Sequence, residues 1–514
     1  MARRVVALSQ ATSAAVAALV LLLVLMPIGA VALRASWPEG LGPADWAALR
    51  FTVLQAVLSA LASVVLAVPV ARALARRSFP GRGALVLLMG APFILPVIVA
   101  VMGLLAVFGQ GGILNTFLAW AGLPKVQIYG LHGVVLAHVF FNLPLATRLL
   151  LQGWESIPQE RFRLAASLGL GPNALLRWIE IPMLKERLPS VFLVVFLICL
   201  SSFAVALTLG GGPRATTLEL AIYQAFHLEF DLGRAALLAL VQLVLVLVAG
   251  LVALWLGQVA GFGAGRGAPR QRWDVSSASL RAQDMGVLAL ATAFIALPLA
   301  LVALRGVAAL GQLPASVWQA AVASLGVAVG STVLCLLAAL ALAAARGPWA
   351  QVIGLLGLAV SPLVLGTGLF LWINPYASPQ ALALPVTMVV NALMALPFAL
   401  RIIAPDYART EADFGRLADA LGLHGWARLR RLIWPQTRAA MGFAAGLTAA
   451  LSMGDLGVIS LFADAENATL PLQVYRLMGA YRMEAAAGAA LLLVGLSFGL
   501  FALLDWGGRR GAHS

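Results

Sequence analysis

Two blocks of the sequence share nine residues at a constant offset of 253 positions (435 − 182), with no insertion between them. The shared residues are Leu164, Ala165, Leu168, Gly169, Leu170, Ala174, Leu176, Arg177 and Pro182 in the first block and Leu417, Ala418, Leu421, Gly422, Leu423, Ala427, Leu429, Arg430 and Pro435 in the second. Leucines one helical turn apart form a narrow apolar ridge, which can lie in a groove of a soluble partner. The repetition therefore predicts two equivalent docking helices rather than two solvated loops that are alike by chance.

Other shared residues define the ends of each docking helix. Gly169 and Gly422 permit the chain to turn sharply, because glycine adopts left-handed backbone angles without steric cost. The proline that ends each block precedes the next apolar run, where its missing backbone N–H leaves no helical hydrogen bond unmade. Arg177 and Arg430 are expected to reach acidic groups of the partner or lipid headgroups.

Asp455 is an acidic residue inside a long apolar run, and its counterpart at the same offset is Ser202. A charged side chain in hydrocarbon costs several kcal/mol, so such a residue is a candidate functional group. Two roles remain open at this point. Asp455 contacts a cationic solute on a translocation path that also includes Ser202, or it is a gating or packing acid that hydrogen-bonds to the partner half.

Enzymatic chemistry has few candidate residues in this chain. A Walker A loop needs Gly-Lys-[Ser/Thr], and the two lysines, Lys125 and Lys185, do not follow a glycine. The five histidines show no HExxH motif or other metal-ligand spacing, and no nucleophile elbow is present with a plausible base. Cys199 and Cys335 fall inside apolar runs and are expected to be small buried hydrophobic residues. We therefore expect no catalytic residue, metal or cofactor, and any ATP is hydrolysed by another polypeptide.

The composition indicates a protein that lies in lipid. Of the 514 residues, 62% are hydrophobic and 11% are charged, whereas soluble domains contain about 25% charged residues. A membrane-spanning helix needs about 20 apolar residues, and continuous runs of this length favour helices over the alternating pattern of membrane strands. The predicted fold is an all-α polytopic membrane protein with about twelve transmembrane helices. The predicted spans are 12–33, 50–71, 84–108, 130–150, 189–210, 233–257, 286–304, 316–345, 350–373, 382–403, 438–462 and 485–504.

The distribution of charge predicts which side of the membrane each loop faces. The net charge is +14, and arginines gather in alternate loops, whereas the loops between them carry acids such as Glu219, Glu229 and Asp231. The positive-inside rule then places both termini and both docking blocks in the cytoplasm. Topology explains the positive charge, so we expect no nucleic-acid partner. The first apolar run is longer than the roughly 7–15 residues of a signal peptide core, and we expect it to be retained as a helix.

The repetition extends to two halves of the chain. The segment 142–148 resembles 395–401 at the same offset, and 52–56 resembles 316–320 at an offset of 264 (316 − 52). We expect a first half at 1–257 with a docking loop at about 152–187, a linker at 258–284, and a second half at 285–514 with a docking loop at about 404–437. Six spans in each half give two parallel six-helix repeats with a translocation path between them. The offset falls from 264 to 253 between these two matches, so the first half contains additional residues between them. We expect these residues to form a short interfacial helix within 109–129.

Each block resembles the EAA loop of ABC-importer permeases, in which a Glu-Ala-Ala triplet is followed at fixed spacing by Gly and then by Ile-x-Leu-Pro. The matching residues are Gly169, Ile179, Ile181 and Pro182 in the first block and Gly422, Leu432 and Pro435 in the second. Both copies depart at the glutamate position, which holds Arg163 and Arg416. The resemblance implies that the shared residues of both blocks couple the chain to an ATPase, and the role of the glutamate does not carry over.

A narrower resemblance covers essentially the whole chain. The segments 131–144, 209–225 and 469–475 are similar to thiamine permeases, in the iron(III)/thiamine branch of fused double permeases. This resemblance implies a bacterial inner-membrane complex of the chain with two copies of a cytoplasmic ABC ATPase. It also implies a periplasmic solute-binding protein, which meets the outer loops 210–231 and 463–481. Thiamine and its phosphates are the implied small-molecule solutes, and iron(III), sulfate and polyamine are the alternatives.

Two further classes of protein are rivals to an ABC-importer permease. A secondary transporter needs intramembrane acids or histidines that couple solute to an ion, and apart from Asp455 the spans offer few. A polytopic membrane enzyme needs a catalytic cluster of histidine and acidic residues, and the sequence shows none.

Overall fold

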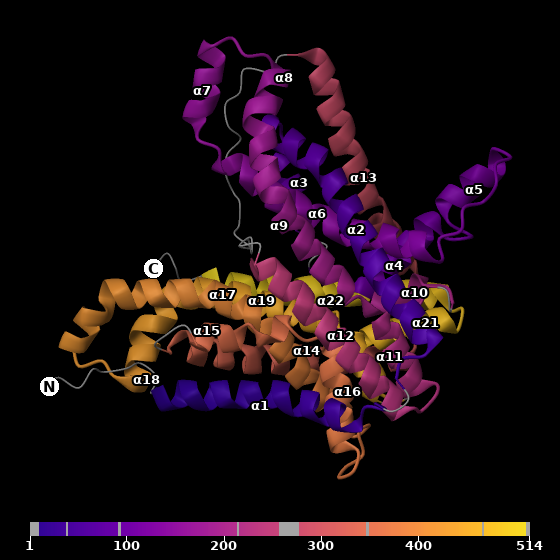
Figure 1. Cartoon of the computed structure of the whole chain (residues 1–514), viewed down its shortest axis with the longest axis vertical. Helices are drawn as coiled ribbons and strands as arrows, with labels where there is room; N and C mark the ends of the chain where they lie inside the picture. Colours follow the sequence, from indigo (N-terminus) through magenta and orange to yellow (C-terminus); the bar gives the residue numbers. More distant parts are fainter. Residues whose placement is uncertain are drawn as a thin grey trace.

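All regular secondary structure among the described residues of the computed structural model is helical, and these residues are 10–37, 40–90, 94–212, 215–255, 277–345, 349–464 and 467–509 (Figure 1). The helices up to residue 255 are α1 (Gln10–Arg34), α2 (Pro43–Arg76), α3 (Arg82–Leu88), α4 (Val97–Phe108), α5 (Ile113–Trp120), α6 (Leu131–Ser156), α7 (Gln159–Ser167), α8 (Pro172–Leu175), η2 (Leu176–Glu180), α9 (Ile181–Leu200), α10 (Phe203–Leu209), α11 (Leu218–His227) and α12 (Leu232–Trp255). The later helices are α13 (Ala278–Ala309), η5 (Leu310–Gln312), α14 (Ala315–Ala343), α15 (Trp349–Gly354), η6 (Leu356–Leu358), α16 (Pro362–Ile373), α17 (Ala383–Ala420), α18 (Gly425–Arg428), η7 (Leu429–Ile433), α19 (Trp434–Met453), α20 (Gly457–Phe462), α21 (Leu470–Gly479) and α22 (Met483–Arg509).

Ten helices within the described residues are long and apolar enough to cross a membrane, which confirms the predicted all-α polytopic fold. The prediction of about twelve continuous spans differs from the structure. The span expected at 189–210 is divided into α9 and α10, which are bent by 62°. The span expected at 350–373 is divided into α15, η6 and the short apolar helix α16. Proline and polar residues interrupt the helical hydrogen bonds at these breaks, and the surrounding helices must satisfy the freed backbone groups.

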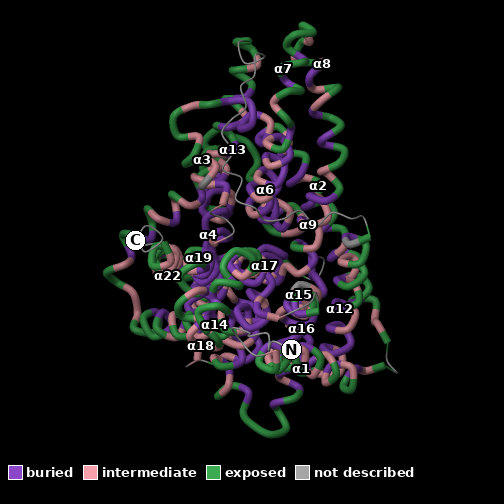
Figure 2. The backbone as a smooth tube through the Cα atoms, turned by 90° about the vertical axis from the view of Figure 1, so that its left-hand side faces the viewer, coloured by how far each residue is buried: buried purple, intermediate pink, exposed green. Residues whose placement is uncertain are grey.

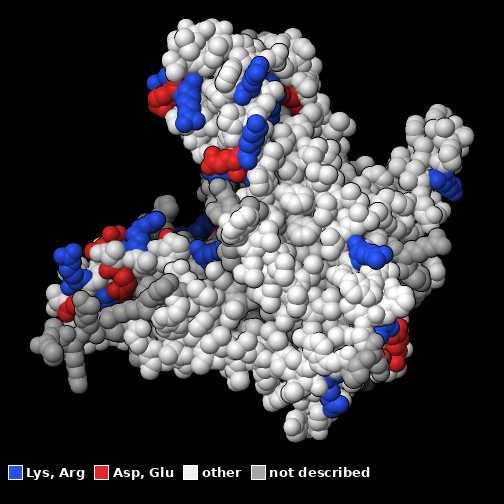
Figure 3. Space-filling view, viewed as in Figure 1, with Lys and Arg blue, Asp and Glu red and all other residues white. Residues whose placement is uncertain are grey.

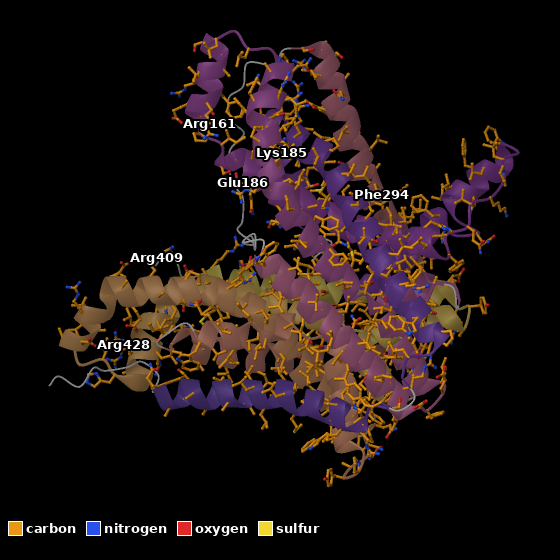
Figure 4. The ribbon with its side chains drawn as sticks, viewed as in Figure 1. Arg161, Lys185, Glu186, Phe294, Arg409 and Arg428 are labelled. Atoms are coloured by element: carbon orange, nitrogen blue, oxygen red, sulfur yellow. The ribbon has the colours of Figure 1, made fainter. Side chains whose placement is uncertain are left out.

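The first helix of each half packs against the other half. α1 lies along α14, α15 and α16, and the Ser13 hydroxyl donates a hydrogen bond of 2.7 Å to the Ala341 carbonyl at the end of α14. Conversely, α13 lies against α2 and α4 of the first half. Its Phe294 lies 5.9 Å from Phe140 of α6, measured between ring centroids (Figure 4). The two halves are therefore interlocked rather than side by side.

Two glycines set how closely α1 and α13 approach the helices of the opposite half. A Cβ atom on Gly368 of α16 would lie 2.3 Å from the Pro27 carbonyl oxygen of α1. A Cβ atom on Gly103 of α4 would lie 2.8 Å from the Pro298 carbonyl oxygen of α13. Small residues at membrane helix interfaces allow backbones to pack closely, which supplies the van der Waals contact that lipid does not replace. A close contact between a glycine of one half and a proline in the first helix of the other half thus occurs twice, once for α1 and once for α13.

The expected linker at 258–284 is described only in part. Residues 258–276 lie outside the described residues, and the chain is helical from Ala278 onward. Asp284 is buried in this helix and accepts hydrogen bonds from Arg77 at 2.7 Å and from Arg76 at 3.4 Å. These ion pairs attach the start of α13 to the end of α2.

The two halves extend as two arms from a common body (Figure 1). α7 and α8 lie at the end of one arm, and the end of α17 with α18 lies at the end of the other. Charged side chains gather at the ends of both arms, whereas the body carries few on the face shown (Figure 3). Buried residues line the interior of the body where the halves meet (Figure 2). Large apolar side chains on α1, such as Leu22 and Leu25, are 57% exposed, as expected for contact with lipid.

The additional residues of the first half form α5, which confirms the expected short helix within 109–129. The buried Asn115 fixes the loop around it. Its side-chain nitrogen donates to the Gly109 and Val126 carbonyls at 2.9 and 2.8 Å, and its oxygen accepts from the Val126 N–H at 2.8 Å. Phe117 and Trp120 on this helix are exposed, at 57% and 82%.

We expect Gly368→Ala to destabilise the protein by about 1–3 kcal/mol, because the new methyl group forces α1 away from α16. Gly326→Ala is the matched control, since a Cβ atom there meets no atom within 4 Å and the substitution improves helix propensity. Thermal unfolding of the purified protein in detergent measures both variants. Equal unfolding temperatures for Gly368→Ala and Gly326→Ala would contradict the close contact.

Candidate functional site

Each predicted docking helix ends in a glycine with left-handed backbone angles. Gly169 has φ +60° and Gly422 has φ +66°. The next residue in each copy donates its N–H back to the buried alanine of the helix: Leu170 to the Ala165 carbonyl at 3.0 Å, and Leu423 to the Ala418 carbonyl at 2.9 Å. These are Schellman motifs, which require a residue that tolerates positive φ. The turn predicted at both glycines is therefore present.

The leucines of each predicted ridge are exposed, whereas the alanine beside them is buried. The exposed fractions are 61% for Leu164, 65% for Leu168, 58% for Leu417 and 67% for Leu421, against 2% for Ala165 and 3% for Ala418. Alanine packs each helix onto its arm and leaves the two leucines, one turn apart, facing outward. Each arm thus presents a short apolar ridge that no described residue covers.

A π-helical turn connects each docking helix to the following span. η2 and η7 lie at the repeat offset, and each is followed directly by the helix that contains the block's proline, Pro182 in α9 or Pro435 in α19. Arg177 and Arg430 lie in these turns and are exposed. The Arg177 guanidinium lies 5.5 Å from the centroid of the neighbouring Trp178 ring. Both arginines therefore remain accessible to a partner or to lipid headgroups.

Different ion pairs hold the two docking segments in place. In the first half, Glu180 is fully buried at the end of η2 and binds Arg72 of α2 at 2.6 Å. In the second half, Arg428 is 3% exposed and binds both Glu411 and Asp419 of α17 (Figure 4). A buried charge of this kind needs its partners, because an unpaired one costs several kcal/mol.

Sequence comparison of the halves did not reveal these ion pairs. At the repeat offset, Glu180 corresponds to Ile433 and Arg428 corresponds to Leu175, and all four side chains are buried. A buried charge in one half therefore replaces an apolar side chain in the other. The ion pairs therefore occur at positions where the sequences of the two blocks differ, so a search for identical residues does not find them.

A cavity of about 390 Å³ lies between the two halves, and both contribute residues to its walls. Asp455 and Ser202 both line it, so the structure brings together the two residues predicted for the translocation path. Both lie at helix breaks, Ser202 between α9 and α10 and Asp455 between α19 and α20. The breaks place polar side chains and free backbone groups at the cavity instead of in lipid, as membrane proteins require.

Hydrogen bonds to neighbouring helices satisfy the polar groups at the breaks. In the first half, the His138 ring contacts Ser202 Oγ at 2.6 Å and Ser59 Oγ at 3.0 Å. In the second half, the Asn391 amide donates to Ser452 Oγ at 3.0 Å. The carboxylate oxygen Oδ1 of Asp455 accepts from the Gly457 N–H at 3.2 Å and so begins α20. These bonds fix the cavity walls on both sides.

Glu219 also lines the cavity, although the sequence indicated an acid of an outer loop. It lies on α11, where only 1% of its surface is exposed. Thr217 begins this helix by accepting a hydrogen bond from the Leu220 N–H at 3.3 Å. The apolar runs did not include this segment, so hydropathy gave no signal that the helix turns back into the body.

Curated relatives match the chain over most of its length. The thiamine transport system permease protein ThiP of Brucella abortus (strain 2308) is 40% identical over 473 residues, which cover 90% of this chain and 87% of that protein. The chain belongs to the ThiP permease family. The ThiP proteins of Salmonella typhimurium and Escherichia coli are 40% and 39% identical, each over 90% of this chain and 88% of the relative.

A more distant relative matches a portion of the chain that corresponds in length to one half. The molybdenum transport system permease protein ModB of Mycobacterium bovis is 32% identical over 244 residues, which cover 88% of that protein and 46% of this chain. No model of a protein family matches the chain. The ModB match therefore covers most of that permease but less than half of this chain.

We expect Arg428→Met to loosen the second docking segment, because it removes a buried cation from between Glu411 and Asp419, at a cost of about 3 kcal/mol or more. Hydrogen exchange of residues 411–428 should become faster. Arg409→Met is the matched control (Figure 4), since Arg409 is 74% exposed and its pair with Asp406 is a surface contact of little value. Unchanged exchange in Arg428→Met would show that the ion pairs do not hold the segment.

Proposed function

We propose that the chain is the membrane-spanning permease subunit of an ATP-driven, binding-protein-dependent ABC importer for thiamine. The observation that carries this proposal is the match to ThiP permeases over 90% of the chain. A cavity lined by both halves supports it, because solute crosses such permeases between two repeats that alternate in access.

The permease has no ATPase site of its own and binds two copies of a cytoplasmic ABC ATPase. Two exposed apolar ridges, one on each arm, support the copy number, since equivalent ridges fit equivalent grooves. Leu164, Leu168 and Gly169 form the contact of the first arm, together with Ala165, Arg177 and Pro182. Leu417, Leu421 and Gly422 form that of the second, together with Ala418, Arg430 and Pro435.

The arms face the cytoplasm, and both termini lie on that side of the bacterial inner membrane. Two contacts support the proposal that both chain ends lie on the same side of the membrane as the second docking segment. Ser13 of α1 bonds to the end of α14, and Arg438 of α19 bonds to the Gly508 carbonyl of α22 at 3.2 Å. On the opposite side, the outer loops 210–231 and 463–481 meet a periplasmic solute-binding protein. Lipid covers the apolar surface between the two sides.

ATP binding closes the ATPase pair and draws the two arms together. In the structure the arms are apart at their docking ends (Figure 1), which is the arrangement expected before closure. Closure rocks the two interlocked units about the axis between them, so that the cavity opens outward and receives solute past Ser202 and Asp455. ATP hydrolysis then returns the arms to the separated state and releases solute inward.

The proposal predicts that a bacterial strain without this chain loses ATP-dependent uptake of labelled thiamine and regains it with the wild-type gene. Competition with unlabelled iron(III), sulfate or polyamine tests the alternative solutes, none of which should reduce the uptake. Uptake in vesicles with a proton gradient but no ATPase would instead identify a secondary transporter.

We expect Leu168→Asp combined with Leu421→Asp to insert normally into the membrane, because both side chains are already exposed. ATP hydrolysis stimulated by the binding protein should fall by about tenfold or more, since a charge replaces the apolar contact in each groove. Ala412→Asp is the control, as it adds a charge to an exposed position of α17 nine residues before Leu421. Full uptake by the double variant would refute docking through these ridges.

A further inference from the structure

The two docking helices carry the same pair of opposite charges beside their apolar ridges. Glu160 and Arg163 on α7 correspond to Asp413 and Arg416 on α17 at the repeat offset of 253 (413 − 160). All four side chains are exposed. In each helix the arginine directly precedes the first leucine of the ridge, and the acid lies three residues before the arginine. A partner that covers the leucines must therefore also meet these charges.

Neighbouring exposed positions of the two helices do not keep their charge. Arg161 and Ala166 are exposed on α7, and they correspond to the exposed Phe414 and Asp419 of α17. One arm thus loses a cation and gains an acid relative to the other. The repeated acid and arginine persist within a surface that varies around them, as expected where one kind of subunit contacts both arms.

The repeated charges have no ion-pair partner in the part of the chain that the structure describes. Residues three apart on a helix are close enough to pair, but neither Glu160 with Arg163 nor Asp413 with Arg416 does so. By contrast, Arg428 of the second docking segment is held by two acids. The structure engages that buried cation internally and leaves both exposed arginines available to another molecule.

The alternation of charge favours a protein surface over a lipid surface as the partner. Anionic lipid attracts a cluster of positive side chains, but here an acid lies one helical turn from each arginine. A negatively charged membrane that attracted Arg163 would repel Glu160. A folded protein can place a group of the opposite sign against each charge, and such complementarity selects the partner and fixes its orientation.

We propose that the cytoplasmic ABC ATPase carries an acidic side chain at the edge of its docking groove, which pairs with Arg163 in one copy and with Arg416 in the other. The proposal rests on the function proposed above and adds the charge of the partner's surface. Arginine binds a carboxylate through two parallel hydrogen bonds. This pair therefore sets the direction of each docking helix in its groove, and the leucine ridge supplies the apolar contact.

A carbodiimide tests the contact directly, because it joins a lysine amine to a carboxylate that touches it and takes up the water lost as the amide forms. The chain has only two lysines, Lys125 and Lys185, so a background with both changed to arginine contains none. In that background, Arg163→Lys and Arg416→Lys should each yield a covalent product with the ATPase in membranes. Mass spectrometry should locate both links at the same acidic residue of the ATPase.

A matched lysine elsewhere on α17 is the control for this experiment. Arg409 is 74% exposed and lies seven residues before Arg416. Arg409→Lys in the same background should form no link to the ATPase from that position. The background without lysine shows which products arise from lysines of the ATPase and acids of the permease.

Charge reversal measures the contribution of the pair to binding. Arg163→Glu combined with Arg416→Glu should weaken binding of the ATPase to the purified permease by about tenfold or more, because like charges then face each other. Arg161→Glu combined with Arg409→Glu makes the same change in net charge and should alter the affinity by less than about threefold. Arginine in place of the linked ATPase acid should restore binding to the first double variant, which a folding defect would not permit.

The outcomes separate this proposal from the proposed function. If the wild-type permease binds no ABC ATPase, the proposed function fails, and the acidic contact fails with it. If the ATPase binds but forms no link to either introduced lysine, or links to a different acid from each, the shared acid is wrong and the proposed function stands. Wild-type affinity in Arg163→Glu with Arg416→Glu also overturns the pair. Links from both positions to one acid, with rescue by the reversed ATPase, support it.

Discussion

The reciprocal packing of α1 and α13 is the constraint on which the other features of this structure depend. Each helix comes close to the backbone of a helix of the other half, α1 at Gly368 of α16 and α13 at Gly103 of α4, while it also packs on its own half. In lipid, helices associate through close van der Waals contact and hydrogen bonds rather than through the hydrophobic effect. The glycine contacts and the Asp284 ion pairs with Arg76 and Arg77 therefore hold the halves together, and the ion pairs lie one helical turn from the Arg72 contact with the first docking segment.

The first helices also connect the two halves of the chain. The sequence divides into two consecutive halves, but α1 packs mainly on the second half, and α13 packs on α2 and α4 of the first half as well as on α22 of its own. Around the cavity, helix breaks and hydrogen-bonded polar groups replace continuous helix packing between the halves.

The two docking segments have the same backbone turns and exposed residues but are supported by different side-chain interactions. Their ridges, glycine turns and π-helical turns repeat at a fixed offset, as equal partners on the cytoplasmic side would require. Beneath them, the Glu180–Arg72 pair supports one segment and the Arg428 cluster supports the other. The exposed surface of these segments is thus more alike in the two halves than the interior beneath it.

The sequence alone determined the membrane environment and the helical fold class, and it predicted the positions of both docking segments, because hydropathy and an ungapped repeat are local properties of the chain. It also identified Asp455 and Ser202 through their offset, without showing that they line one cavity. The tertiary structure decided the exchange of α1 and α13, the broken spans and the burial of Glu219. Each of these depends on contacts between segments more than 100 residues apart or on a helix that returns into the body from an outer loop. No periodicity or charge count in the sequence encodes such contacts, since the same local pattern is compatible with either half as the packing partner.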